Sequence, residues 1–211
     1  MALFRDRADA GRLLAAALER WRGSDAVVVG IPRGGVVVGA AVARELSLPL
    51  TAVVVRKLGA PAHEEFAVGA IADDIRLVDE RAVRAEGAGA AAMRAVEERE
   101  RAELRRRSEL FAGGPGVAGR PVLVVDDGVA TGATATVACR ALRARGATEV
   151  ILAVPVAPAR WHPPPDAVDE LVCPHQEAAF WAVGQFYADF TQTPDAEVVD
   201  LLAGDPRDRA V

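Results

Sequence analysis

Two adjacent acidic residues followed by a loop of small residues are the part of this sequence best suited to chemistry. Residues 122–134 read VLVVDDGVATGAT, so an apolar run ends at Asp126 and Asp127 and a turn bearing glycine and threonine follows. Ionised carboxylates accept strong hydrogen bonds from vicinal sugar hydroxyls. Loop amides and the N-terminus of the helix predicted after them can bind a phosphate group. The motif therefore predicts a site for a phosphorylated sugar.

The loop itself has residue types that suit a phosphate. Gly132 permits a positive φ and a close approach to a ligand, while Thr131 and Thr134 supply hydroxyl donors. The acid pair, Asp126 and Asp127, can also help to hold Mg²⁺, which prefers oxygen ligands. An acidic turn with a threonine N-cap is the alternative that needs no ligand. Paired acids at a strand end, followed by TGAT, favour the ligand site.

Two groups of cationic residues precede the acid pair. Arg33 lies in residues 29–35, VGIPRGG, where a predicted strand turns into a predicted helix. Its guanidinium suits diphosphate oxygens, although a plain strand-to-helix turn is an alternative. Arg56 and Lys57 follow the next predicted strand and either face a polyanionic substrate or form ordinary solvated surface. Residues 29–35 have neither the GxGxxG spacing of a dinucleotide site nor the lysine of a P-loop.

Strands and helices are predicted to alternate along the chain. The expected strands are residues 26–31, 51–55, 68–72, 75–78, 122–125, 150–154 and 168–172, and the expected helices are 6–21, a stripe from Val38 to Leu46, 89–111, 135–145 and 196–202. This alternation predicts an α/β fold with a mostly parallel twisted sheet flanked by helices. Ligands of such sheets bind at the carboxyl ends of the strands. If the strands before them are neighbours, Arg33, the pair Arg56 and Lys57, and the pair Asp126 and Asp127 are therefore expected to converge on one crevice.

Size and charge narrow the functional classes. The chain has 211 residues, enough for one domain, and its net charge of −5 disfavours nucleic acid as a partner. The first residues lack the apolar core of a signal peptide, and no apolar run is long enough to cross a membrane. Cys139 and Cys173 are predicted to be free thiols in a reducing cytoplasm. The charged run at residues 97–109, EERERAELRRRSE, predicts a solvated helix face, with nucleic-acid binding as the alternative.

Residues 122–134 resemble the phosphoribosyl pyrophosphate signature of the type I phosphoribosyltransferases. The resemblance implies a single domain over residues 1–211, with a core of about 24–172 and a small hood from about 1–22 and 173–211. It also implies that Asp126 and Asp127 contact the ribose hydroxyls. The residues implied to wrap the 5′-phosphate are Gly128, Val129, Ala130, Thr131, Gly132, Ala133 and Thr134.

The same resemblance implies where pyrophosphate binds and what reaction follows. Arg33, Gly34 and Gly35 correspond to the pyrophosphate loop, and Arg56 and Lys57 to cations that assist its departure. Together with Asp127, these two cations are the implied catalytic residues. The implied reaction is displacement of Mg²⁺-pyrophosphate from phosphoribosyl pyrophosphate by a nitrogenous acceptor, a nucleobase. The alternative is a non-catalytic regulator of the same fold that senses phosphoribosyl pyrophosphate or nucleotides.

The sequence says least about the roles of two segments, the predicted lid over residues 58–66 and the hood. Residues 58–66, LGAPAHEEF, fall where the family keeps a mobile loop, so His63, Glu64 and Glu65 either touch substrate or face solvent. The chain's histidines show no spacing typical of a metal site. The aromatic residues of the tail either stack on a base or form the hood's own core, and these are Phe180, Trp181, Phe186, Tyr187 and Phe190. Dimers are common in the family, so a homodimer is an expectation from the resemblance, and the two thiols predict a cytoplasmic location.

Overall fold

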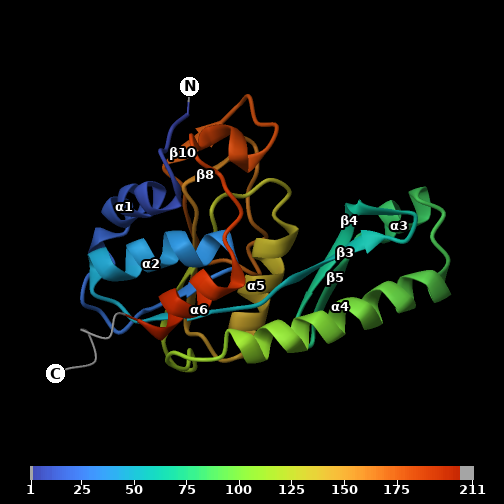
Figure 1. The fold of residues 1–211 in the computed structure, drawn as a ribbon, viewed down its shortest axis with the longest axis horizontal. Coiled ribbons are helices and arrows are strands. Elements are labelled where there is room, and N and C mark those ends of the chain that lie inside the picture. The colour runs from blue at the N-terminus through green and yellow to red at the C-terminus, as the bar shows by residue number, and fades with distance from the viewer. Residues whose placement is uncertain (1, 205–211) are drawn as a thin grey trace.

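A five-stranded parallel sheet forms the centre of the molecule. The computed structural model describes residues 2–204, and Figure 1 shows the sheet between two layers of helices. The strand order is β2-β1-β6-β7-β9, and every neighbouring pair is parallel. The strands are β1 (Val27–Gly30), β2 (Leu50–Ala52), β6 (Pro121–Val125), β7 (Glu149–Ala153) and β9 (Glu170–Val172). The predicted α/β fold with a parallel sheet flanked by helices is thus confirmed.

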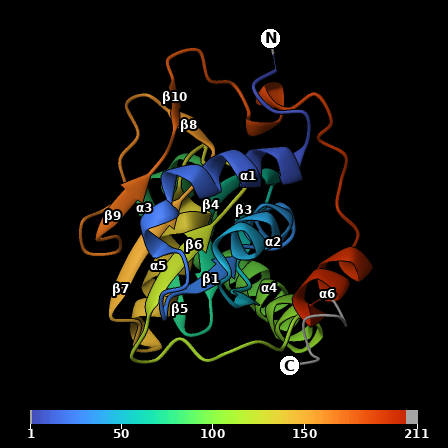
Figure 2. The same ribbon diagram turned by 90° about the vertical axis from the view of Figure 1, so that its left-hand side faces the viewer.

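Both faces of this sheet are covered, which explains why its strands are apolar throughout. Val27 and Val29 pack on the side of α5 (Ala133–Ala144). Val28 packs on the opposite side, toward α1 (Arg7–Ala17) and α2 (Gly34–Leu46). Figure 2 shows α1 and α2 lying together in front of the sheet. The helices therefore fix the carboxyl ends of β1 and β6 from both sides.

A second, antiparallel sheet extends from the central body. Its order is β3-β4-β5, and it carries two helices on the right of Figure 1. We call this part the arm; it comprises β3 (Arg56–Ala60), β4 (His63–Ala72), β5 (Ile75–Val78), α3 (Glu80–Ala85) and α4 (Ala90–Leu110). Leu58 and Ile71 of the arm sheet share a buried cluster with Met93, Val96 and Leu104 of α4. The long helix is thereby held against the sheet by its thin apolar stripe.

The arm differs from the prediction in two places. The strand expected over residues 51–55 ends at Ala52, and Arg56 begins a new strand instead of following the old one. The loop expected over residues 58–66 is a β-hairpin of β3 and β4. Gly59 explains the close pairing, because a Cβ there would lie 2.2 Å from the Glu64 carbonyl oxygen. Glycine and proline, which suggested a loop, here serve a narrow hairpin.

Segments from the two ends of the chain meet over one edge of the body. Phe4 forms a β-bridge with Tyr187, and both side chains are buried with Phe186 and Val156. The remaining elements are η1 (Glu19–Trp21), a pair of parallel strands β8 (Val156–Pro158) and β10 (His175–Glu177), η2 (Val183–Phe186) and α6 (Asp195–Ala203). Within residues 2–204, no helix is long and apolar enough to cross a membrane.

Candidate active site

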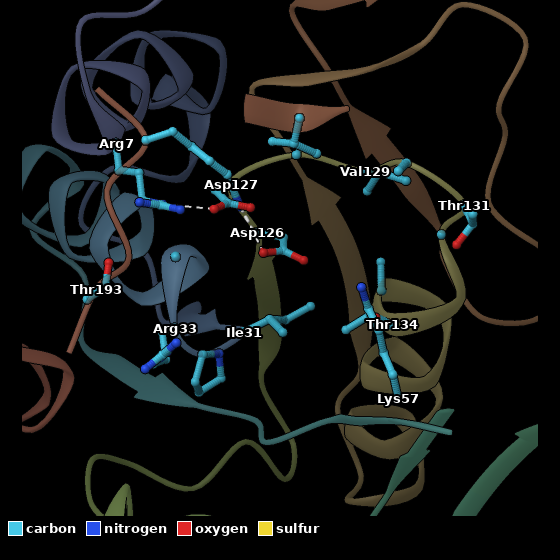
Figure 3. A pocket seen from close by; sticks show the side chains of 18 of the residues that line it. Arg7, Ile31, Arg33, Lys57, Asp126, Asp127, Val129, Thr131, Thr134 and Thr193 are labelled. Carbon is cyan, nitrogen blue, oxygen red and sulfur yellow. Dashed lines mark hydrogen bonds and ion pairs between the residues drawn. The ribbon is translucent and has the colours of Figure 1, made fainter. Parts of the chain in front are cut away.

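A cavity of about 390 Å³ opens at the carboxyl ends of β1 and β6. We call it the central cavity, and Figure 3 shows the side chains that surround it. The sequence-predicted residues that line it are Arg33, Gly34, Lys57, Asp126, Asp127, Gly128, Val129, Ala130, Thr131, Gly132 and Thr134. Gly35, Arg56 and Ala133 are not part of its lining. The loops that follow β1 and β6 therefore meet Lys57 of β3 at one crevice, whereas Arg56, which was also expected there, lies outside it.

The acid pair lies at the end of β6 and is held by two hydrogen bonds. The Asp127 amide donates to Asp126 Oδ1 at 2.9 Å, and Arg7 Nε donates to Asp127 Oδ2 at 2.8 Å. The two carboxyl groups also hydrogen-bond to each other, which raises the pKa of Asp126 and lowers that of Asp127. The acid pair is thus held in place at the end of β6, where both residues line the cavity.

Burial sets the protonation of these acids. Loss of solvent and the neighbouring Asp127 charge raise the pKa of Asp126 well above its ordinary value. Burial also raises the pKa of Asp127, although the Arg7 guanidinium acts in the opposite direction. A ligand that brings cations or hydroxyl donors to the pair would therefore favour the ionised forms.

Arg7 is a part of the cavity that the sequence did not reveal. Asp6 caps α1 by accepting from the Asp9 amide at 2.7 Å, which makes Arg7 the first residue of the helix. Besides its bond to Asp127, Arg7 donates from Nη1 to the Thr191 carbonyl at 2.7 Å. Its guanidinium also lies 4.0 Å from the centre of the Phe190 ring. One arginine therefore joins α1, the acid pair and the C-terminal segment.

The loop after the acids is shaped to receive an anion. The backbone N–H groups of residues 130–134 donate to no acceptor in the described structure, and they precede or begin α5. Gly132 has a φ of 80°, and a Cβ there would lie 2.3 Å from the Trp161 ring. Trp161 Nε1 also donates to the Thr131 carbonyl at 3.2 Å. Trp161, which the sequence did not single out, thus holds the loop through the Thr131 carbonyl, and the amides of the loop remain free.

Two glycines let the opposite loop approach the acids. A Cβ on Gly34 would lie 2.0 Å from Asp127 Oδ2, and one on Gly35 would lie 2.5 Å from the Val125 carbonyl oxygen. The N-terminus of α2 can therefore abut the end of β6. Arg33 stands at this helix start, with Nη1 at 3.6 Å from Asp195 Oδ1. The peptide bond between Pro32 and Arg33 is cis.

Arg56 and Lys57 point in different directions. Lys57 lines the central cavity near Thr134, as Figure 3 shows. Arg56 instead donates from Nε and Nη2 to Glu100 Oε2 of α4, at 2.9 and 2.7 Å. This follows from the strand that begins at Arg56, since neighbouring strand residues project to opposite faces. Of the two predicted cations, Lys57 is the one that faces the acid pair.

The predicted lid residues lie in the arm and outside the central cavity. His63 Nδ1 is 2.7 Å from Glu86 Oε2, and Glu64 forms a 3.3 Å ion pair with Arg99. The prediction for the Glu65 side chain lies outside what the structure describes. Among the residues described, no cluster of three or more metal-ligating side chains occurs.

The tail aromatics divide between core and surface. Phe186 and Tyr187 are buried, and the Tyr187 hydroxyl donates to the Asp127 carbonyl at 2.6 Å. Burial raises the pKa of Tyr187, so the phenol remains a donor. Trp181 is 90% exposed. Phe190 lines the central cavity together with Val183, Gln192 and Thr193. The tail thus supplies one wall of the cavity as well as an anchor.

Comparisons with known proteins agree with this arrangement. The family model of the phosphoribosyl transferase domain matches residues 5–191. Two strains of Mycobacterium tuberculosis carry relatives, named provisionally as phosphoribosyl transferases, that are 49% identical over 218 residues. The alignment covers 100% of this chain and 48% of each relative, so the chain spans about half of their length.

A crystal structure with a similar fold comes from Thermus thermophilus. Its protein, TT1426, is 39% identical to this chain and superposes with a TM-score of 0.72. The match covers 96% of this chain and 98% of the other. The family model covers most of the sequence, including the acid pair and both loops. This chain therefore belongs to the phosphoribosyl transferase domain family.

Proposed function

We propose that this chain is a Mg²⁺-dependent phosphoribosyltransferase that binds phosphoribosyl pyrophosphate. It would transfer the phosphoribosyl group to a nitrogenous acceptor, a nucleobase, and release pyrophosphate. The observation that carries the proposal is the placement of the acid pair between two loops, each at a helix N-terminus, around one cavity. Membership of the family supports the transferase class.

The ribose would bind at the acid pair. Both acids line the central cavity, and a vicinal diol has two hydroxyls that can donate to them in place of the hydrogen bond between the two carboxyl groups. Arg7 donates to Asp127 and the Asp127 amide donates to Asp126, so both carboxyl groups are oriented. Such orientation favours binding because little conformational entropy is lost when the sugar arrives.

The two anionic ends of the substrate would bind on either side of the ribose. The free amides of residues 130–134 and the hydroxyls of Thr131 and Thr134 suit the 5′-phosphate. Arg33, the N-terminus of α2 and Lys57 suit the pyrophosphate. Positive groups here would stabilise the negative charge that grows on the leaving group as the glycosidic bond breaks.

Magnesium would be held mainly by the substrate. Two adjacent acids that line the cavity fit an ion that keeps several waters and binds phosphate oxygens, whereas they do not form a complete protein cage. Asp126 or Asp127 would complete its ligand set. Bound there, the ion would neutralise diphosphate charge. The chain's own residues would fix the sugar and exclude water from a cationic sugar-like transition state.

The acceptor would bind against the wall made by the tail. Val183 and Phe190 offer apolar surface, and Gln192 and Thr193 offer polar groups, all facing the same cavity as the acids. In Figure 3, Thr193 of this wall lies near Arg7 and Arg33, whereas Lys57 lies beside Thr134.

One assay tests the proposal. The protein is incubated with Mg²⁺, phosphoribosyl pyrophosphate and a panel of purine and pyrimidine bases, and pyrophosphate release is measured. We expect release with at least one base, and loss of it when EDTA is added. Tight binding of phosphoribosyl pyrophosphate without turnover on any base would instead support the regulator. Absence of binding in calorimetry would contradict both functions.

The resemblance to the type I enzymes also supports a cytoplasmic location and a homodimer as proposals. Light scattering coupled to size-exclusion chromatography tests the homodimer directly. A mass near 22.1 kDa at micromolar concentration would contradict it.

A further inference from the structure

A second cavity of about 380 Å³ lies between the arm sheet and α4. We call it the arm cavity. Four cationic side chains and two carboxylates line it, namely Arg56, Lys57, Arg99, Arg107, Glu64 and Glu100. It is almost as large as the central cavity and shares Pro32, Lys57 and Thr134 with it. The two cavities are therefore neighbours that meet at Lys57.

The charged run of α4 accounts for one wall of the arm cavity. Arg99 and Arg107 are eight residues apart, which places them on one helix face two turns from each other. The sequence alone predicted that this run would be a solvated surface. In the structure, the side chain of Arg107 is 21% exposed and forms an ion pair with Glu103 at 2.7 Å. Most of the run is exposed, as predicted, and Arg99 and Arg107 in addition border a hollow.

The ion pairs inside the arm cavity leave positive charge unbalanced. Glu100 accepts from Arg56 at 2.7 Å, while Arg99 lies 3.3 Å from Glu64 and 3.4 Å from Glu100. Lys57 has no ion pair with any residue in the described range. When Glu103, the partner of Arg107, is counted, the four lining cations face three carboxylates, so one positive charge remains in a chain whose net charge is −5. Concave walls of one sign concentrate ions of the opposite sign.

We propose that the arm cavity binds a polyphosphate anion, either inorganic or the phosphate tail of a nucleotide, and that this anion weakens binding in the central cavity. Its volume admits several phosphate groups, and guanidinium groups bind phosphate oxygens in pairs. The binding itself is independent of the proposed transferase function. The coupling rests on that function, because it concerns the affinity for phosphoribosyl pyrophosphate.

Lys57 supplies the coupling. An anion in the arm cavity draws the shared ammonium group away from the pyrophosphate position and adds negative charge beside it. Both effects oppose a second polyanion a short distance away. Because coupling between two sites is reciprocal, phosphoribosyl pyrophosphate must weaken the arm anion by the same factor.

The test counts anion sites by calorimetry with inorganic tripolyphosphate. The variant is Arg99→Gln with Arg107→Gln, since neither residue lines the central cavity. The matched control is Arg105→Gln, an exposed arginine of the same helix that lines neither cavity. We expect the double variant to lose one site relative to wild type, and the control to lose none. Arg99→Gln alone, at a side chain that is 55% exposed, should fold normally and weaken that site about tenfold.

The outcomes separate this inference from the proposed function. Equal numbers of sites with equal affinities in wild type and double variant would overturn the arm cavity as an anion site. If phosphoribosyl pyrophosphate does not bind, the proposed function fails, whereas the loss of one tripolyphosphate site still supports the cavity. Tighter binding of ATP than of tripolyphosphate identifies a nucleotide as the natural ligand, and equal binding identifies an inorganic anion.

The coupling has its own readout. In wild type, the apparent Kd for phosphoribosyl pyrophosphate should rise as tripolyphosphate is added and reach a plateau when the arm cavity is saturated. Direct competition in the central cavity would add a component that keeps rising linearly with tripolyphosphate. The double variant should keep the linear component and lose the saturating one. The same curve in both proteins would refute the coupling.

Discussion

Arg7 Nε lies 2.8 Å from Asp127 Oδ2, although 120 residues separate the two in the sequence. Both side chains are largely buried, with 12% and 15% of their surface exposed. A buried carboxylate needs such a partner, because an unpaired charge in a poorly solvated place is strongly unfavourable. The pair therefore both stabilises the fold and fixes the direction of one proposed ribose ligand.

The first prediction concerns Arg7. Arg7→Ala should lower the free energy of unfolding by about 3 kcal/mol, because Asp127 is left unpaired. It should also raise the Kd for phosphoribosyl pyrophosphate about tenfold, since Asp127 loses its orientation. Urea unfolding and calorimetry measure the two effects. Arg7→Lys keeps a cation but loses the hydrogen bond to Thr191, so its stability and its affinity should lie between those of wild type and Arg7→Ala. If Arg7→Lys is no better than Arg7→Ala, the ion pair is not the cause of the two losses.

The second prediction separates stability from binding at Asp126. The pKa of Asp126 is raised in the folded protein by burial and by Asp127, so ionisation costs folding free energy. This cost is absent below the ordinary pKa of 3.8 and complete above the raised folded-state pKa. Asp126→Asn should therefore unfold at higher denaturant concentration than wild type at pH 7, with the difference vanishing at low pH.

The same variant should bind phosphoribosyl pyrophosphate far more weakly than wild type, and Asp126→Asn with Asp127→Asn should abolish binding. Calorimetry at pH 7 provides the check. Binding at wild-type strength by the double variant would disprove the ribose role of the acid pair. If Asp126→Asn is less stable than wild type at pH 7, neighbouring groups stabilise the buried charge of Asp126 in the wild-type protein.

The third prediction concerns Gly34, the first residue of α2. Gly34→Ala would place a methyl group 2.0 Å from Asp127 Oδ2 and 2.6 Å from Arg7 Nε. The loop must then move, at a cost of about 1–3 kcal/mol in stability and with loss of ligand binding. Gly116→Ala is the control, because no atom lies within 4 Å of its added carbon. Similar melting temperatures for the two variants would show that the loop is looser than its contacts indicate.

The fourth prediction distinguishes the two cations that follow β2. Lys57→Gln should raise the Kd for phosphoribosyl pyrophosphate about tenfold, because its ammonium group faces the acids. Arg56→Gln should have a smaller effect on binding, since Arg56 is engaged by Glu100. It should instead lower stability by leaving that carboxylate without its main partner. A larger loss of affinity in Arg56→Gln would mean that Arg56 leaves Glu100 when the substrate binds.

Local patterns in the sequence were enough to predict the sheet and its loops. The β-branched runs around Val28 and Val124 could be assigned to buried strands, and the acids follow one of them directly. The strands of a parallel sheet all end at the same edge, which places Arg33 and Asp126 there, whereas the order of the strands comes from the structure. The roles assigned to these residues stay predictions until binding is measured.

Contacts between distant segments could not be predicted in this way. Nothing near Arg7 or Trp161 in the sequence indicates that they meet residues 120 and 30 positions away. Arg56 was assigned to the pyrophosphate because it follows a strand, but its orientation depends on Glu100, which belongs to a helix of the arm. A shift of one residue in a strand reverses the face to which each side chain points. The strand expected over residues 51–55 ends at Ala52, and Arg56 begins the next strand.

The bridge between Phe4 and Tyr187 has a consequence for how the protein is made. Asp127 takes one contact from the first helix and another from the Tyr187 hydroxyl, 60 residues later in the chain. A growing chain on the ribosome therefore exposes β1, β6 and the acid pair well before Tyr187 has been added. The hydrogen bond from Tyr187 to Asp127 can form only after residue 187 has been added. Nascent chains shorter than 187 residues should be inert toward phosphoribosyl pyrophosphate even where their central strands have already paired.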